Sequence, residues 1–387
     1  MRIYNSLTRS KQEFSSLSPK TVSLYVCGIT PYDTTHLGHA FTYISFDALI
    51  RVLKLKGYKV SYTQNVTDIN DRDNDILKRA KEQGKTWQEL TKYWTSLFLS
   101  DMEYLNWIKP DNYLYASKQI KQMTDLIEKL LKNEIAYEVN SSVYLDILKI
   151  NDFGKLSKLN KDEMFKIATD FEEGVDDKQK RNPLDITLWK KREENQSNHI
   201  PFFESPFGLG RPGWHIECSA MAVDSLGEQI DIHGGGRDLI YPHHEAEIAQ
   251  VEGATGKIPF AKYWLHTGQV AYRGEKMSKS LGNLVMVSDL RKKYSANAIR
   301  YMLLLNHYRS DWEYTEEMME RAALAMDLIS KTIQKINSSG FDPSKDSMIL
   351  LEDDLNVHKV LDLIMTNIRN INAVKTRTIL ENLGFIF

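Results

Sequence analysis

Two histidines, His36 and His39, enclose a Leu-Gly pair in the stretch CGITPYDTTHLGH, residues 27–39. Apolar and polar residues alternate just upstream, and apolar residues recur at helical spacing downstream, so we expect a strand-to-helix turn. A helix N-terminus offers unpaired N–H groups and a partial positive charge, which suit a phosphate group, and Gly38 would allow close approach. The stretch therefore predicts a phosphate site. An ordinary loop with two capping histidines is the alternative.

A second candidate phosphate-binding segment, KMSKSLGN, begins at Lys276. Its lysines, Lys276 and Lys279, flank small hydroxyl residues in what we expect to be a flexible loop. Mobile positive charges of this kind can neutralise pyrophosphate as it leaves a triphosphate. Alone, the segment could be solvated surface. Together with the HLGH turn at one end of a βαβ sheet, it predicts a clamp for ATP.

Thiol, imidazole and carboxylate side chains in three separated segments could bind a metal. His243 and Glu247 stand four residues apart in a helical stretch, so they share one face of the helix. The two cysteines, Cys27 and Cys218, are both expected near strand ends, and in a reducing compartment such distant cysteines are more often buried thiols or metal ligands than a disulfide. A lone His/Glu pair is usually a solvated contact, but the four residues together favour zinc.

The elements that must position these residues read as an α/β pattern. The first 70 residues give strand, turn, helix and strand, which is a βαβ unit of the doubly wound kind. The stretch NVTDIND, residues 65–71, follows the second strand, where we expect either ligand contacts or a helix cap. The glycine-rich turn HGGGRD, residues 233–238, follows another short strand and requires a close approach of the backbone to a ligand or another strand.

Four regions are expected along the 387 residues. They are the first half of a Rossmann-like catalytic domain (1–70), an inserted helical and connective region (71–200), the second half with the KMSKS loop (201–295), and a C-terminal helical bundle (296–387). The fold class is thus α/β with a doubly wound parallel sheet. Charge runs within residues 151–198 are expected to be solvated surface rather than a dedicated binding patch.

Composition limits the function classes. The hydrophobic content of 42% is ample for a sizeable core, and the formal net charge of -2 predicts no overall attraction to nucleic acid, although a local basic groove could exist. No run approaches the roughly 20 apolar residues of a membrane helix, and the start lacks an apolar signal region. We expect a cytoplasmic protein without membrane contact.

These motifs together resemble the class I aminoacyl-tRNA synthetases. The HLGH motif differs from their HIGH motif only by leucine for isoleucine, and KMSKS is complete. Within that class, Cys27 and the stretches GWHIECS and PHHEAE look like the cysteinyl-tRNA synthetases and the related cysteine ligase of mycothiol synthesis. The resemblance extends from residue 1 to about residue 383, nearly the whole chain, and it implies the class I synthetase catalytic fold.

The resemblance also implies a role for each candidate residue. Zinc would be bound by Cys27, Cys218, His243 and Glu247, with the substrate thiolate joining them on the metal, and the cysteine pocket would comprise Cys27, Thr67, Trp214 and His243. The adenylate would be held by Gly28, Ile29, Thr30, Gly38, Thr42, Gly236, Asp238 and Lys279. The catalytic residues would be His36, His39, Lys276 and Lys279, with the lysines on the β- and γ-phosphates. Mg²⁺ is expected with ATP.

The expected reaction is the activation of L-cysteine by ATP to cysteinyl-adenylate. The cysteine carboxylate would attack the α-phosphate, with positioning and charge stabilisation supplying the rate and no protein nucleophile required. Because zinc favours thiolate over hydroxyl, such a site rejects serine without an editing domain. A non-catalytic paralogue that senses cysteine is a weaker alternative, since all four catalytic histidines and lysines are present.

The acceptor of the cysteinyl group separates the two branches of the family. ITPYDTTHLGHA, QNVTD and the segment MFKIATDFEEGVDDKQKRNPLD look more like the mycothiol ligase, whereas MRIYNSLTR and Glu247 look more like the synthetase. The mycothiol branch's ERGGDP motif is only loosely matched by Glu172-Glu173-Gly174, and residues 71–75 depart from both branches by an apparent short insertion.

The net charge of the C-terminal region decides between the two acceptors. Residues 301–387 carry 9 Lys plus Arg and 13 Asp plus Glu, a net of 9 − 13 = -4, and no anticodon-reading domain is evident. Negative charge disfavours contact with a polyanionic tRNA stem. We therefore expect a small-molecule amine, glucosaminyl inositol, as the acceptor of a monomeric enzyme. The alternative is a minimal cysteinyl-tRNA synthetase that charges tRNA(Cys).

Overall fold

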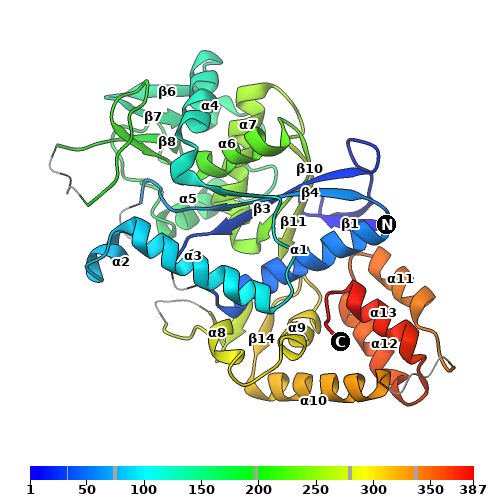
Figure 1. Ribbon diagram of the computed structural model, residues 1–387. Coiled ribbons are helices and arrows are strands. Elements are labelled where there is room, and N and C mark those ends of the chain that lie inside the picture. The colour runs from blue at the N-terminus through cyan, green and yellow to red at the C-terminus, as the bar shows by residue number, and fades with distance from the viewer. Residues whose placement is uncertain (33, 73–75, 195, 197–198, 278–280, 335–338) are drawn as a thin grey trace.

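A five-stranded parallel sheet, in the order β11-β10-β3-β4-β5, forms the centre of the protein (Figure 1). Its strands are β3 (Thr21–Ile29), β4 (Lys59–Val66), β5 (Asn112–Tyr115), β10 (Ile230–Gly236) and β11 (Ala261–Thr267). The computed structural model describes residues 1–32, 34–72, 76–194, 196, 199–277, 281–334 and 339–387. The strand order reverses direction between β3 and β10. This confirms the predicted doubly wound sheet and places a ligand crevice at the carboxyl ends of these two strands.

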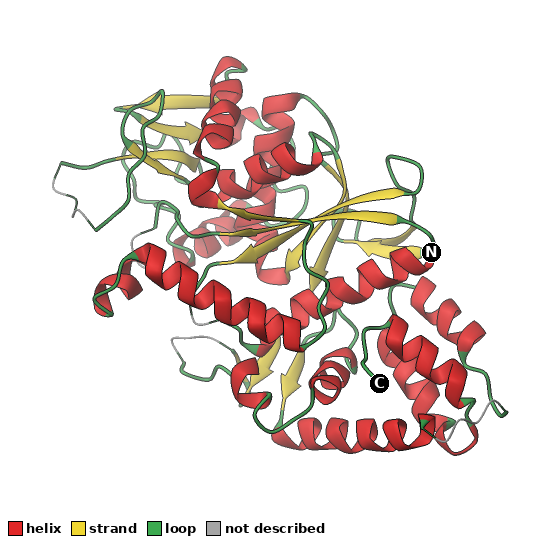
Figure 2. Cartoon of the chain, viewed as in Figure 1, coloured by secondary structure: helices red, strands yellow, loops and turns green. Residues whose placement is uncertain are grey.

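Helices cover both faces of the sheet, as Figure 2 shows. On one face lies α1 (Leu37–Leu55), which connects β3 to β4 and packs against α9 (Ala296–Leu304). On the other face lie α4 (Ile120–Lys132), α6 (Trp214–Leu226) and α7 (Glu245–Thr255), which contact one another. Two hydrophobic clusters fill the spaces between the sheet and these helices. In β3 the residues 24–27 are all buried, as expected for a strand that is covered on both faces.

The predicted strand-to-helix turn is present between β3 and α1. The Nδ1 atom of His36 accepts a hydrogen bond from the N–H of Gly38 at 3.1 Å, so His36 is the N-cap of α1. The capping interpretation of this histidine is therefore correct. It does not exclude the phosphate site, because the helix dipole still gives this N-terminus a partial positive charge.

The range 71–200 includes part of the central sheet as well as an insertion. After α2 (Ile76–Glu82) and α3 (Trp87–Tyr104), β5 pairs with β4. The insertion proper is an antiparallel sheet with α5 (Lys161–Asp170), and its strands are β6 (Ala136–Val139), β7 (Ser142–Leu145), β8 (Ile186–Lys191) and β9 (Gly210–Pro212). The sequence pattern did not indicate β5, because a half-buried edge strand of four residues is too short to show a period.

The position of Cys218 differs from the expectation of a strand end. It lies within helix α6, and the preceding β9 belongs to the antiparallel sheet and not to the central one. The chain turns sharply at Gly213, where an added Cβ would lie 2.0 Å from the carbonyl oxygen of Thr187 in β8. This close contact, which depends on a distant strand, ends β9 and starts the helix one turn before the cysteine.

The C-terminal region is helical, as predicted, and shares a core with α1. Its other helices are α8 (Val287–Leu290), α10 (Glu316–Ile333), α11 (Ser344–Glu352), α12 (Val357–Thr366) and α13 (Ala373–Asn382). Buried Arg300 on α9 donates to the Asp47 carboxylate on α1 and, at 2.8 Å, to the carbonyl of Leu383. The bundle is thereby joined to the helix that carries His39.

Two small sheets complete the fold. They are the N-terminal hairpin of β1 (Arg2–Asn5) and β2 (Ser10–Glu13), and a three-stranded sheet of β12 (Val270–Tyr272), β13 (Glu275–Lys276) and β14 (Trp312–Tyr314). Among the residues that the structure describes, no helix has both the length and the apolar character needed to cross a membrane.

Candidate active site and metal centre

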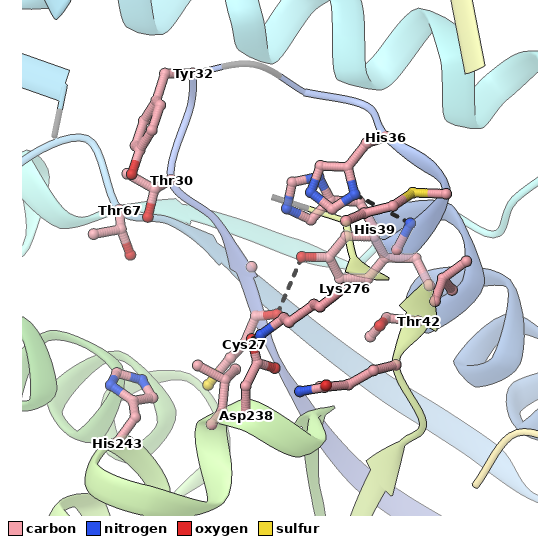
Figure 3. Close-up of a pocket in the computed structure, with 18 of the residues that line it drawn as sticks. Cys27, Thr30, Tyr32, His36, His39, Thr42, Thr67, Asp238, His243 and Lys276 are labelled. Atoms are coloured by element: carbon pink, nitrogen blue, oxygen red, sulfur yellow. Dashed lines mark hydrogen bonds and ion pairs between the residues drawn. The ribbon is translucent and has the colours of Figure 1, made fainter. Parts of the chain in front are cut away.

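A cavity of about 570 Å³ opens at the carboxyl ends of β3 and β10, where the strand order reverses. The candidate residues that line it are Cys27, Gly28, Thr30, His36, Gly38, His39, Thr42, Thr67, Trp214, Cys218, Gly236, Asp238, His243 and Lys276. Figure 3 shows His36 and His39 at one side of this cavity and Cys27 and His243 at the other. The sequence motifs, which are spread over 250 residues, therefore meet in one place.

Three candidate residues are not part of the described lining. Ile29 is buried in β3, and Glu247 lies behind the wall on α7. Lys279 lies outside the residues that the structure describes. Lining residues that sequence reasoning did not select include Tyr32, Tyr43, Asn65, Gln269 and Met277. Of these, Tyr32, Asn65 and Met277 stand inside the stretches CGITPYDTTHLGH, NVTDIND and KMSKSLGN, and that position is the signal that could have identified them.

The four predicted zinc ligands lie together. Cys27, Cys218, His243 and Glu247 each offer a ligand atom within 4.8 Å of the other three, and all four side chains are buried. They come from β3, from α6, from the turn before α7 and from α7 itself. Two thiols, an imidazole and a carboxylate are the donors that zinc prefers, and four is its usual coordination number. The donor set therefore fits zinc.

A second group of potential ligands shares two members with the first. It consists of Cys27, His233, His244 and Glu247. Both groups contain Cys27, which lines the cavity. The first group also reaches the cavity through Cys218 and His243, whereas His233 and His244 are buried and do not line it. Instead, His233 Nε2 lies 2.9 Å from Glu247 Oε2, and His244 Nε2 lies 3.3 Å from Cys27 Sγ. These two histidines are placed to hold the ligands.

Burial dominates the electrostatics of this centre. Desolvation, followed by contacts with Cys218 and Glu247, raises the pKa of the Cys27 thiol well above its usual range. Burial likewise raises the pKa of Glu247 and lowers that of His243. Such a dry group of acidic ligands can ionise only beside a compensating cation, so a divalent metal would replace the protons of the ligands that bind it.

The side of the cavity opposite Cys27 and His243 is built from the HLGH turn and from Lys276, Met277 and Leu284. The rings of His36 and His39 stack with their centroids 3.8 Å apart. Two backbone hydrogen bonds of 2.9 Å, from Leu37 N to the Val285 carbonyl and from Val287 N to the Thr35 carbonyl, join this turn to the segment that follows KMSKS. The HLGH turn is thus held beside the segment that follows the KMSKS motif.

Lys276 lies at the edge of the cavity on β13. Its Nζ is 3.2 Å from Oδ2 of Asp238, and both side chains are about half exposed. Nearby, the hydroxyl groups of Thr42 and Thr267 share a hydrogen bond of 2.8 Å. A ligand with negative charge could therefore reach Lys276 from solvent and compete with Asp238 for it.

The close contact of β3 and β4 forms the floor of the cavity. The N–H of Gly28 donates to Asn65 Oδ1 at 2.7 Å, and Asn65 Nδ2 donates to Thr67 Oγ1 at 3.0 Å. Thr67 is thereby oriented beside Cys27. In the same stretch Asp68 accepts hydrogen bonds from the backbone and hydroxyl of Ser117, so it does not cap the helix that follows.

The wall beside the metal ligands is aromatic. The ring of Trp214 lies 4.4 Å from that of His243, and the guanidinium of Arg72 covers it at 4.0 Å. His215, the next residue along α6, contacts His243 from behind. Sequence reasoning missed His215, His233 and His244, although they stand inside the quoted stretches GWHIECS, HGGGRD and PHHEAE, because burial and partners are not visible in the sequence.

Known proteins similar to this chain were found by sequence and by structure. The family described as tRNA synthetases class I (C) catalytic domain matches residues 13–324. The cysteine--tRNA ligase of Thermodesulfovibrio yellowstonii is 41% identical over 96% of this chain and 79% of its own length. That of Thermococcus onnurineus is 47% identical over 87% and 68%.

Among solved structures, Mycobacterium tuberculosis methionyl-tRNA synthetase in complex with methionyl-adenylate has a TM-score of 0.67 and 16% identity. The match covers 93% of this chain and 84% of that one. At this identity the likeness concerns the fold alone. It agrees with the parallel sheet and with the helices on both its faces.

Proposed function

The chain belongs to the class I tRNA synthetases, in the family of the C-type catalytic domain, and is a ligase; we propose that it activates L-cysteine with ATP and attaches it to tRNA(Cys). One observation carries the proposal. Two thiols, an imidazole and a carboxylate lie within 4.8 Å of one another at the wall of the cavity whose other side is the HLGH turn. A thiol-selecting group thus stands beside a phosphate-binding group.

Selection of cysteine is assigned to the metal side of the cavity. Cys27, Cys218, His243 and Glu247 would hold zinc, which when bound supplies a preference for thiolate over hydroxyl. Thr67, oriented by Asn65, and Trp214 close the pocket around the substrate. The restricted space and the aromatic wall exclude water from the bound amino acid.

Activation is assigned to the opposite side. His36, His39 and the partial positive charge at the N-terminus of α1 would bind the phosphates of ATP, which arrives with Mg²⁺. Gly28, Thr30, Gly38, Thr42, Gly236 and Asp238 provide the surface for the adenylate. Lys276 would exchange Asp238 for the departing pyrophosphate, and Lys279 would add its charge to the same group. No residue serves as nucleophile, because the cysteine carboxylate attacks the α-phosphate directly.

The acceptor is tRNA(Cys) in this proposal, although the acidic C-terminal region favoured a small amine. The relatives reported above are named cysteine--tRNA ligase, and their names support the tRNA. The three-dimensional structure also weakens the argument from the net charge of residues 301–387. Glu352 and Asp353 pair with Lys56, Arg2 and Lys11, which belong to other parts of the chain. A count over residues 301–387 omits these partners.

Competition between acceptors tests the proposal. Preformed cysteinyl-adenylate bound to the protein is offered tRNA(Cys) and glucosaminyl inositol in parallel reactions. We expect cysteinylation of the tRNA and no product with the amino sugar. Efficient transfer to the sugar, with the tRNA unchanged, would restore the amine ligase. A lack of cysteine-dependent exchange of pyrophosphate into ATP would instead support the non-catalytic cysteine sensor.

A further inference from the structure

A line of hydrogen-bonded side chains leads from His243 away from the cavity to Glu173. Nδ1 of His243 lies 2.9 Å from Nδ1 of His215, and Nε2 of His215 lies 2.9 Å from Oε2 of Glu173. His215 and His243 are each 1% exposed and Glu173 is 14% exposed. Glu173 follows α5 in the inserted region, so it comes from a different part of the chain than the four ligands. It does not line the cavity.

The chemistry of the three groups sets the direction of the hydrogen bonds. An ionised carboxylate can only accept, so Nε2 of His215 must carry the proton that faces Glu173. Nδ1 of neutral His215 then has a lone pair, which accepts from Nδ1–H of His243. This leaves the lone pair of His243 on Nε2, the atom that lies 3.3 Å from Glu247 Oε1 within the group of ligands. The carboxylate thereby selects the tautomer of His243 that can bind a metal.

Glu173 is held in its ionised form by its surroundings. Burial alone would raise its pKa, but the hydrogen bond from His215 and the positive charges of Arg72 and Lys180 outweigh that effect and lower the pKa to about 2. Arg72 pairs with Oε1, the oxygen that does not face His215. The ε-ammonium of Lys180 donates to the backbone carbonyl of the same residue, which fixes the loop.

The same carboxylate also supports the wall of the cavity. Arg72, which it binds, lies over the ring of Trp214 at 4.0 Å, and the ring of Phe171 stacks nearly parallel to that indole at 6.2 Å. Trp214 in turn contacts His243. Glu173 is thus connected to His243 by two routes, one through His215 and one through Arg72 and Trp214.

We propose that Glu173 is a positioning residue of the metal centre, which fixes the tautomer and orientation of His243 through His215. The inference rests on the proposed zinc site and adds a residue that is neither a ligand nor part of the cavity lining. Carboxylates commonly orient histidine ligands directly. Here a second histidine is interposed, so the inserted region of the chain controls a ligand on the catalytic domain.

The test measures zinc affinity in the full chain by competition with a chelator, and the visible spectrum after replacement of zinc by Co²⁺. Glu173→Ala is expected to weaken zinc binding by about 10- to 100-fold and to alter the Co²⁺ bands. Glu173→Gln should have a smaller effect, because its amide oxygen still accepts from His215. The matched control is Glu172→Gln, which removes the neighbouring exposed carboxylate and should change neither measurement.

A double-variant cycle separates positioning through His215 from a general effect of charge or folding. If Glu173 acts through His215, then Glu173→Ala should weaken zinc binding less than about twofold further in a His215→Ala chain. Equal zinc affinity and unchanged Co²⁺ bands in Glu173→Ala and the parent, or full additivity in the cycle, would overturn the inference alone. A parent chain that binds no zinc would overturn the proposed metal site itself. If Glu173→Ala does not fold, the Co²⁺ spectrum of Glu173→Gln is compared with that of the parent instead, and unchanged bands would overturn the inference.

Discussion

At the scale of single residues, the proposed zinc site makes a prediction for its second thiol, Cys218. Cys218 projects from α6 toward Cys27, and both are buried. Cys218→Ser replaces a soft thiolate by a hydroxyl that binds zinc poorly. We expect zinc affinity to fall by more than the about 10- to 100-fold typical of outer partners, and discrimination against serine to be lost with it.

Metal analysis and pyrophosphate exchange with cysteine or serine check this prediction. Ser225→Ala, on the same helix, is the control, because its hydroxyl bonds only the preceding turn at Met221. Full zinc content together with full discrimination in Cys218→Ser would show that the ligand assignment is wrong.

A second residue-scale prediction concerns the lysines of KMSKS. Their charge matters most as pyrophosphate leaves, so removing it should lower turnover more than it weakens cysteine binding. We expect Lys279→Ala to reduce kcat by about 10²- to 10³-fold, the cost of one preorganised charge contact in a transition state, with KM for cysteine little changed. Lys276→Ala should act in the same direction.

The measurement is steady-state pyrophosphate exchange in the absence of RNA. Lys292→Ala is the control, since that exposed lysine pairs with Asp289 on the surface of the neighbouring helix. Equal kinetics in Lys279→Ala and the parent would exclude the catalytic role.

At the scale of elements, the site depends on how closely β3 and β4 approach. An added Cβ at Gly28 would lie 1.6 Å from the carbonyl oxygen of Asn65, so the strands must separate to accept it. We expect Gly28→Ala to destabilise the protein by about 3 kcal/mol and to impair cysteine activation, because Cys27 and Thr67 lie on either side of the contact. The midpoint of urea unfolding measures the first effect.

The matched control for this change is Gly253→Ala on α7. Its Cβ would meet the ends of the Ile135 and Leu130 side chains at 3.1 and 3.3 Å, and alanine favours the helix, so a change of about 1 kcal/mol or less is expected. Similar midpoints for the two variants would contradict the explanation based on the strand contact.

The elements also show what the sequence can predict. The turn at His36 and the pair His243 and Glu247 were predictable, because strand alternation, helical spacing and an N-cap are local patterns. The strand β5 and the helical position of Cys218 were not, because each depends on a partner far away in the chain: β4 for the one and Thr187 for the other.

The candidate site divides in the same way. The side chains that could bind a metal or a phosphate were predictable from their residue type and spacing within motifs. The structure brings together those that it describes. The roles of the residues that hold them, such as Asn65, His215 and Glu173, could not be assigned. These roles follow from burial and from hydrogen bonds between segments that are tens of residues apart.

At the scale of the whole molecule, the C-terminal region is joined to the rest of the chain by buried charges. Asp354 is fully buried and accepts from the N–H of Tyr4, the hydroxyl of Tyr308 and the guanidinium of Arg309. The first strand, the segment after α9 and the segment after α11 thus meet at one carboxylate. This explains why residues 301–387 can be acidic in sequence while part of that charge is neutralised at an internal junction.

The titration of His307 at this junction provides the last prediction. Its Nε2–H donates to the Asp354 carbonyl at 2.9 Å, and burial, aided by Arg309 and His358 and partly offset by the Asp354 carboxylate, lowers its pKa to about 4. In the unfolded chain the pKa is about 6.5, so between these values the unfolded state binds the extra proton. The free energy of unfolding should therefore fall as the pH decreases from about 6.5 to about 4.

His307→Asn preserves a side-chain N–H donor and does not titrate. Its free energy of unfolding is measured by urea at several pH values. Within this window the slope of that free energy against pH should be smaller than in the parent, by up to about the slope that the binding of one proton produces. Above the window the two curves should be parallel. His358 lies 5.4 Å away, ring to ring, and burial also lowers its pKa, so His358→Gln is the comparison variant. Parent and His307→Asn curves that remain parallel from pH 7 to pH 4 would show that this histidine does not carry the acid sensitivity of the junction.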